Sequence, residues 1–275
     1  GLKADGELVI GKDDGTGPVM TIATTGAMLS GGSTSGTTKP GTNRPGGMGG
    51  NWGGGTSSSS GSSSKAIKAE GAAYVKGGSL SVTTATDGAE GLESKTSITI
   101  SGGTHYFQCY DDCINSPGKI TFAGGTTVCF ANGNDAVDSN YGKSGAITLS
   151  VGNVVAYSSQ GGAEEGFECD NNEYIVVTGV IAVSAGGRQG GSTSSIGSST
   201  QGYYRGNSPS SYSSSTYYTR YNTSGEAICT YKFAGNWSTT LNFLTAPNLG
   251  KGSITIKSGT AKPTACDISV NDVFF

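Results

Sequence analysis

The chain has 275 residues, of which 48 are glycine and only 13% are charged, a composition that argues against long amphipathic helices and favours an all-β domain. No apolar run reaches the roughly 18 residues that a transmembrane helix needs. The net charge is −3, yet residues 87–173 carry twelve Asp or Glu and only three Lys. This acidic middle argues against a nucleic-acid partner and favours a cation.

The first predicted strands are two short apolar runs, Leu8–Ile10 and Val19–Ile22. They precede residues 29–64, a stretch of mostly Gly, Ser and Thr that predicts a mobile loop insertion. No apolar signal region precedes Gly1, so an export signal or lipid anchor, if there is one, lies outside these residues.

After this loop a four-residue phrase recurs: an acid, a small residue, an apolar residue and a polar or acidic residue. A looser copy with lysines at both ends, Lys65–Lys68, comes first. From Ile67 the central apolar residues recur at spacings of 25, 22, 23 and 30 residues. A period of 20 to 30 residues predicts a solenoid, in which each repeat buries its apolar face against its neighbours. The four acidic copies are Glu90–Glu93, Asp112–Asn115, Asp135–Asp138 and Glu165–Glu168.

Two short β-branched runs separated by a glycine turn follow each phrase, as in Ser97–Ile100 and Thr104–Phe107. With the strand around the phrase, each repeat has three short strands, the pattern of a parallel β-helix with successive coils about 4.8 Å apart. We expect one domain, residues 1–275, of roughly seven coils. Forward, the coils would extend to Leu241–Leu244 and Ser253–Ile256.

Stacked coils would align the acids of successive phrases in columns. Unit charges about 4.8 Å apart repel by roughly 3.5 kcal/mol at an effective dielectric of 20. Ca²⁺ takes 6 to 8 oxygens at about 2.3–2.6 Å, so an ion between two coils would relieve this repulsion. The alternative is a solvated acidic ladder that is screened by salt. We expect several Ca²⁺ ions, with ligands from Asp87, Glu90, Glu93, Asp111, Asp112, Asn115, Asp135, Asp138, Glu164, Glu165, Glu168 and Asp170.

A second insertion, residues 186–225, is rich in Ser but also contains six Tyr and three Arg. Loops over a rigid scaffold often carry binding groups, and Tyr faces can stack on sugar rings while Arg grips carboxylates. The predicted ligand-binding residues are Lys68, Arg188, Tyr203, Tyr204, Arg205, Tyr217, Tyr218 and Arg220.

The cysteines and the single histidine suggest no catalytic or zinc site. The six cysteines either form two or three disulfides of undetermined pairing, as suits an exported protein, or fill core positions as small hydrophobic residues. His105 lies in an apolar run, where packing is expected. The cysteines are Cys109, Cys113, Cys129, Cys169, Cys229 and Cys266.

The repeats resemble those of the bacterial carbohydrate-binding β-helix proteins related to family 9 polysaccharide lyases. The resemblance implies a right-handed parallel β-helix at the cell surface, calcium between coils, and binding of plant-type acidic polysaccharide such as polygalacturonate. The Tyr-rich insertion has no counterpart in that pattern. The resemblance rests on Lys65–Gly71, Asp87–Lys95, Asp111–Ser116, Asp135–Asn140, Glu164–Asn172, the Gly-rich stretch before Lys65 and residues 246–260.

Three functions follow from this sequence. The first is an extracellular or cell-surface, monomeric, non-catalytic, calcium-dependent polysaccharide binder. The second is a pectate-type lyase, for which Lys68, stacked beside Glu93, is the best candidate base; the competing interpretation is a salt bridge between these two residues. The third is a surface structural or adhesive protein with structural calcium.

Overall fold

The computed structural model describes residues 1–26, 63–160, 164–169, 175–187, 196–206, 209–233, 235–238, 241–249, 255–259, 269–270 and 273–274. These residues form strands, turns and bends and contain no helix, which confirms the all-β class. The described residues therefore include no helix that is long and apolar enough to cross a membrane. Nearly all of the predicted loop 29–64, together with Asp170, Arg188 and Cys266, lies outside the described residues.

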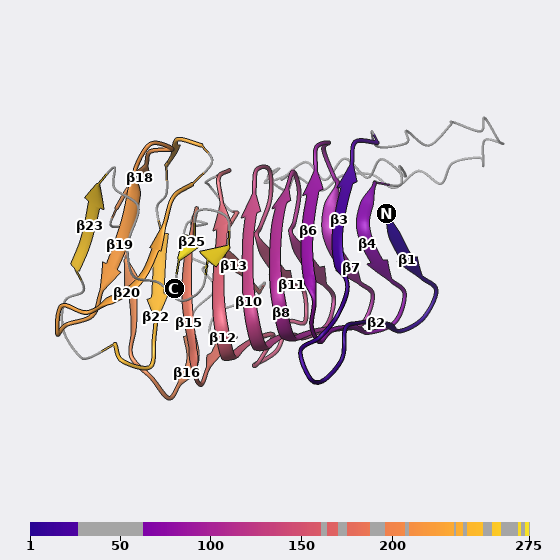
Figure 1. Cartoon of the computed structure of the whole chain (residues 1–275), viewed down its shortest axis with the longest axis horizontal. Coiled ribbons are helices and arrows are strands. Elements are labelled where there is room, and N and C mark those ends of the chain that lie inside the picture. The colour runs from indigo at the N-terminus through magenta and orange to yellow at the C-terminus, as the bar shows by residue number, and fades with distance from the viewer. Residues whose placement is uncertain are drawn as a thin grey trace, which may run out of the picture.

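The acidic phrases lie in a six-stranded sheet, sheet A, in which every neighbouring pair of strands is parallel. The apolar centres of the phrases pair directly, for example Ile67 with Leu92 and Leu92 with Ile114. The predicted stacking of successive repeats is therefore present across this sheet (Figure 1). Its strands, in order, are β1 (Leu2–Ala4), β4 (Lys65–Ala69), β7 (Glu90–Ser94), β9 (Ile114–Ser116), β11 (Val137–Ser139) and β13 (Phe167–Glu168).

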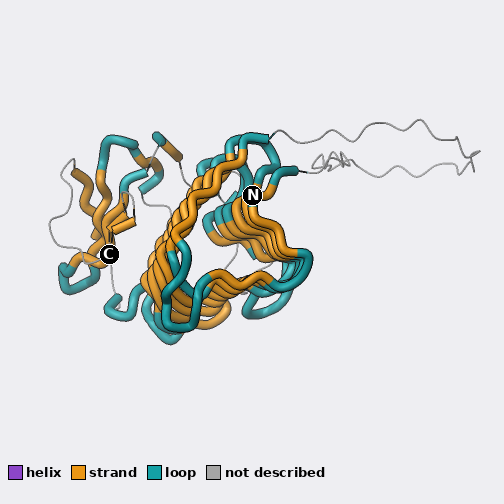
Figure 2. Tube along the Cα trace, turned by 45° about the vertical axis from the view of Figure 1, so that its right-hand side comes forward, coloured by secondary structure: helices purple, strands orange, loops and turns teal. Residues whose placement is uncertain are grey.

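The second and third runs of each repeat lie in a twelve-stranded sheet, sheet B, that is parallel over most of its width. Its parallel strands are β2 (Leu8–Ile10), β3 (Val19–Thr24), β5 (Ala73–Val75), β6 (Ser79–Thr84), β8 (Ile98–Cys109), β10 (Ile120–Ala131), β12 (Ile147–Ser158), β14 (Ile175–Val177), β15 (Val180–Gly186) and β16 (Ile196–Ser199). Figure 2 looks partly along the stack, so that strands of successive repeats superpose.

In the central repeats the two runs predicted as separate strands merge into one strand of twelve residues. The pairing of β10 with β8 continues through the glycine turn, and its register shifts on both sides of Gly124, as at a β-bulge. Gly125 has a φ of 74°, and a Cβ there would lie 2.5 Å from the carbonyl oxygen of Gly103. Glycine is required at this bend because no other residue fits both the backbone angle and the spacing.

The C-terminal strands are antiparallel, so the predicted extension of parallel repeats to Leu241–Leu244 and Ser253–Ile256 is wrong where the structure describes it. Strand β22 pairs antiparallel with β15, and β23 with β19. These strands are β17 (Tyr203–Gly206), β18 (Ser211–Tyr212), β19 (Tyr217–Tyr221), β20 (Ala227–Tyr231), β21 (Trp237–Ser238), β22 (Leu241–Thr245), β23 (Thr255–Gly259), β24 (Ser269–Val270) and β25 (Val273–Phe274).

Two apolar clusters account for this change of architecture. The first joins the inward side chains of sheets A and B, among them Ile67, Leu92 and Ile114, which are fully buried. Burying each such side chain contributes about 1.5–3 kcal/mol. The second is aromatic and packs Tyr212, Tyr231 and other C-terminal residues against sheet B. Because the C-terminal segment has its own aromatic core, it need not continue the repeat.

Candidate functional site

A polar column runs across sheet A, one residue beyond the apolar centre of each phrase. Glu93 pairs with Asn115, Asn115 with Asp138, and Asp138 with Glu168. The predicted alignment of these four residues is confirmed. In the other direction the column continues into Lys68 and Lys3. One end of the column is therefore basic and the other acidic.

The acids at the start of the phrases form a second column that is more deeply buried. Glu90, Asp112, Asp135 and Glu165 are each less than 8% exposed. Asp112 Oδ1 accepts the backbone N–H of Asp135 at 3.0 Å, and Asp135 Oδ1 accepts that of Glu165. Asp112 and Asp135 thus each hold the backbone of the next repeat, a role that the sequence pattern did not predict.

The small residues between the two columns face the core. Cys113 and Ala136 are fully buried members of the first apolar cluster. A Cβ on Gly91 would meet the Cys113 carbonyl oxygen and lie 2.8 Å from the Cys109 sulfur. All five residues of β7 are buried, so the simple alternation of a strand does not hold at this position.

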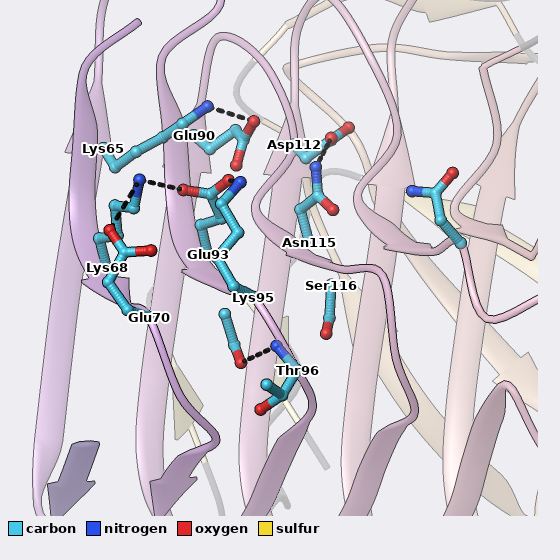
Figure 3. A network of polar contacts seen from close by, with 12 residues as sticks. Lys65, Lys68, Glu70, Glu90, Glu93, Lys95, Thr96, Asp112, Asn115 and Ser116 are labelled. Carbon is cyan, nitrogen blue, oxygen red and sulfur yellow. Dashed lines mark hydrogen bonds and ion pairs between the residues drawn. The ribbon is translucent and has the colours of Figure 1, made fainter. Parts of the chain in front are cut away.

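Lysines neutralise the acids at the basic end of sheet A (Figure 3). Lys65 pairs with Glu90, and Lys95 with Glu93 Oε1. Lys68 lies 3.6 Å from Glu93 Oε2 and 3.3 Å from Glu70 Oε1, which confirms the predicted salt bridge to Glu93. Burial raises the pKa of Glu90, although Lys65 opposes the shift.

Asp112 and Asp135, in the later repeats, lack such neutralisation within the described residues. Burial raises the pKa of Asp112 and Asp135 well above the usual range. For Asp112, repulsion from the neighbouring acids raises the pKa further. Burial also raises the pKa of Asp111 and Glu164. Neither Asp112 nor Asp135 forms a salt bridge within the described part of the chain. Asp135 and Glu164 are within hydrogen-bonding reach of each other, an arrangement that calls for a shared proton or a cation.

The fit of these residues to calcium is partial. Among the described residues, no three His, Cys, Asp or Glu side chains converge closely enough to form a ready metal site. The oxygen-rich set of Asp111, Asp112, Asp135 and Glu164 nevertheless has the hard ligands that Ca²⁺ prefers. Asp87 is exposed, and Asp138 and Glu168 are half-buried. The roles of all these residues as metal ligands stay predictions.

The predicted ligand-binding residues of the second insertion are divided between surface and core. Tyr203 is 48% exposed, and Arg205 is half-buried beside Glu165 at a cavity of about 20 Å³. Tyr204 and Tyr217 are half-buried. These four stay candidates for ligand contact.

Tyr218 and Arg220 belong to the second apolar cluster and its polar centre instead. Tyr218 is 8% exposed and Arg220 is fully buried. Arg220 Nε donates to the Tyr231 hydroxyl at 2.7 Å, and Nη2 donates to the Tyr212 hydroxyl at 2.8 Å. A side chain with no exposed surface does not contact a surface ligand, so the prediction for Arg220 is corrected to a structural role in this conformation. The sequence could not show this because Tyr and Arg serve equally in binding loops and in hydrogen-bonded cores.

The described cysteines are all buried, which supports their interpretation as core residues. Cys109, Cys113 and Cys129 are free thiols inside the first apolar cluster. Burial raises the pKa of the Cys109 and Cys113 thiols well above the usual range, which disfavours the reactive thiolate form.

A family model described as "carbohydrate-binding domain-containing protein" matches residues 53–136. The match includes the lysine-paired acids Glu90 and Glu93 and extends to Asp135. It supports carbohydrate binding and a polysaccharide partner. No curated protein and no solved structure matches the chain.

Proposed function

We propose that this protein is an extracellular, non-catalytic, calcium-dependent polysaccharide-binding protein for acidic glycans. The observation that carries the proposal is the carbohydrate-binding match, whose residues 53–136 cover the aligned Lys68, Glu93 and Asn115 of the polar column and end just before Asp138. The same stacking supports a right-handed parallel β-helix within one domain, residues 1–275, for the parallel part of the chain.

The proposed metal ligands are Asp111, Asp112, Asp135 and Glu164, none of which forms a salt bridge with a lysine within the described residues. Bound calcium would neutralise these carboxylates and offer coordination positions to the carboxylate of a uronate sugar. The protein residues themselves position the site, because Asp112 is fixed by hydrogen bonds to Asn115, at 2.9 Å, and to the backbone of Asp135. Tyr203 and Arg205 are the proposed sugar contacts outside the acidic columns.

A binding assay on immobilised polygalacturonate tests the proposal. Wild-type protein should bind with Ca²⁺ and bind at least about tenfold more weakly with a chelator, since charge-assisted contacts contribute about 1.5–3 kcal/mol each. The Asp135→Asn variant should lose most of the calcium dependence. Asp14→Asn is the control because Asp14 is an exposed acid that bonds only within its own turn, to Thr16.

Equal binding with and without chelator would eliminate the calcium role, and no binding to any acidic or neutral glycan would eliminate the function. The same samples test the lyase alternative. Absorbance of unsaturated product from pectate should stay flat in the presence of Ca²⁺, and a steady rise would establish catalysis instead.

A further inference from the structure

The basic end of sheet A contains an open groove that the acidic columns do not explain. The groove has a volume of about 610 Å³ and lies beside strands β1, β4 and β7. This volume is within the range of about 300–1,000 Å³ that is usual for small-molecule sites. Its lining residues are Gly1, Leu2, Lys3, Ser63, Lys65, Lys68, Glu93 and Lys95.

This region has as many acidic as basic side chains, but the basic ones predominate in the lining of the groove. Lys3, Lys65, Lys68 and Lys95 pair with Asp5, Glu70, Glu90 and Glu93, so the network as a whole is neutral. All four lysines line the groove, whereas only one of the four acids, Glu93, does so. A ligand in the groove therefore meets mainly ammonium groups.

Lys68 is the ammonium best placed to bind a ligand. Its two ion pairs, at 3.3 and 3.6 Å, are long, and within the described residues it makes no hydrogen bond at ordinary distance. Its side chain is 28% exposed, compared with 14% for Lys65. An ammonium group has three donors, so Lys68 can take an anionic oxygen without leaving its carboxylate partners.

Glu93 holds two of these lysines in place. Its side chain is only 6% exposed, and it pairs with Lys95 through Oε1 and lies 3.6 Å from Lys68 Nζ through Oε2. Within the described residues this buried Oε2 accepts no hydrogen bond, so it interacts with Lys68 through charge alone. The carboxylate therefore positions ammonium groups of the groove and does not itself contact a ligand.

We propose that this lysine groove binds the anionic group of one glycan unit directly, without a metal ion, while Glu93 positions Lys68 and Lys95. The inference rests on the proposed polysaccharide-binding function and adds to it a subsite that resists chelation. The anionic group is a carboxylate or a sulfate ester, which present the same charge to the lysines.

The test is titration calorimetry with oligogalacturonate of defined length, in chelator and at low salt. Wild-type protein should bind, and Lys68→Met should bind at least about tenfold more weakly, as expected for loss of a charge-assisted contact. Lys68→Arg should retain most of the binding because it keeps the charge. Lys76→Met is the matched control, since Lys76 pairs with Asp13 away from the groove.

A second variant guards against misfolding of Lys68→Met, which leaves Glu93 with one cation fewer. Lys3→Met removes the most exposed lysine of the groove, at 61% exposure, and should weaken binding severalfold with unchanged melting. Fully methyl-esterified oligomer should not bind in chelator. A sulfated dextran arm shows whether sulfate substitutes for carboxylate.

The outcomes separate this inference from the proposed function. If binding requires Ca²⁺ throughout, the lysine groove is not an anion subsite and the calcium proposal stands. If the esterified oligomer binds in chelator as well as the free acid, recognition does not depend on the carboxylate and the lysine groove is not an anion subsite. If chelator-resistant binding disappears only in the lysine variants, the groove is established. If no glycan binds under any condition, both proposals fail.

Discussion

His105 illustrates how a single side chain is committed to the core. It is fully buried, and its Nε2 lies 2.7 Å from the Gly102 carbonyl oxygen, so Nε2 carries the proton. Nδ1 is buried and has no hydrogen-bond partner among the residues that the structure describes. Burial lowers the pKa of His105 below its ordinary value, which the bond to Gly102 only partly offsets.

The first prediction is that His105 makes the fold sensitive to acid. The unfolded chain binds a proton on this histidine near pH 6.5, whereas the folded chain resists protonation. Stability from this residue is therefore present above pH 6.5 and is lost as the pH falls toward the lowered folded value. Urea denaturation between pH 7.5 and 5.5 should show a steeper decline for wild type than for His105→Gln. Since the chain has one histidine, a proton NMR titration with an ordinary midpoint would contradict this prediction.

For individual residues, the sequence predicted which side chains align across sheet A but not which of the predicted binding residues are buried. The register of Glu93, Asn115 and Asp138 followed from the spacing of the apolar centres alone. The burial of Arg220 did not, because it depends on contacts with Tyr212 and Tyr231 from separate strands.

Strands β9, β11 and β13 are connected by more than their own ladder of hydrogen bonds. Asp112, just before β9, accepts a backbone N–H from Asp135, just before β11. Both residues are less than 7% exposed, so water cannot replace this acceptor. Loss of such a buried bond costs about 1–3 kcal/mol.

The second prediction compares two substitutions of Asp112 in chelator. Asp112→Asn keeps an oxygen acceptor and removes the charge, whereas Asp112→Ala leaves the Asp135 N–H unsatisfied. Asp112→Asn should therefore be more stable by about 1–3 kcal/mol in urea denaturation. The same pair of substitutions at the exposed Asp14 should differ by less than about 0.5 kcal/mol. Equal stability of the two Asp112 variants would mean that the backbone contact is not significant.

Sequence patterns predicted the short strands well but misjudged where they join. Glycine turns normally separate strands, yet β8, β10 and β12 continue through them because neighbouring repeats bend at the same glycines. The bend is visible only when repeats are stacked, since each glycine is constrained by the carbonyl of the adjacent repeat.

The whole molecule combines a parallel stack with an antiparallel aromatic end (Figure 1). The repeat period predicted the first part. It could not predict the second, because Tyr and Ser in residues 186–225 have no period from which pairing could be inferred. Strand β22 shows the transition, since it contacts β15 of the stack yet runs in the opposite direction.

The third prediction concerns thermal stability. If carboxylates of adjacent repeats hold calcium, an ion at 100 times its dissociation constant adds about 2.7 kcal/mol. At roughly 2–4 °C per kcal/mol for a chain of about this size, Tm should rise by roughly 5–10 °C over the value in chelator. Mg²⁺ should have a smaller effect because its octahedral shell is stricter. Superimposable melting curves in Ca²⁺ and chelator would argue against bound calcium.

The ordered succession from Lys3 and Lys68 to Asp138 and Glu168 gives sheet A a direction. A polyanion laid across the strands would find its two ends inequivalent, attracted at one end and dependent on a counter-ion at the other. If both proposed sites bind, calcium concentration would set how many sugar units are held rather than whether the first is held. Binding would then have a direction: the polymer would be held first at the lysine end, and its contacts would then extend along sheet A from one repeat to the next.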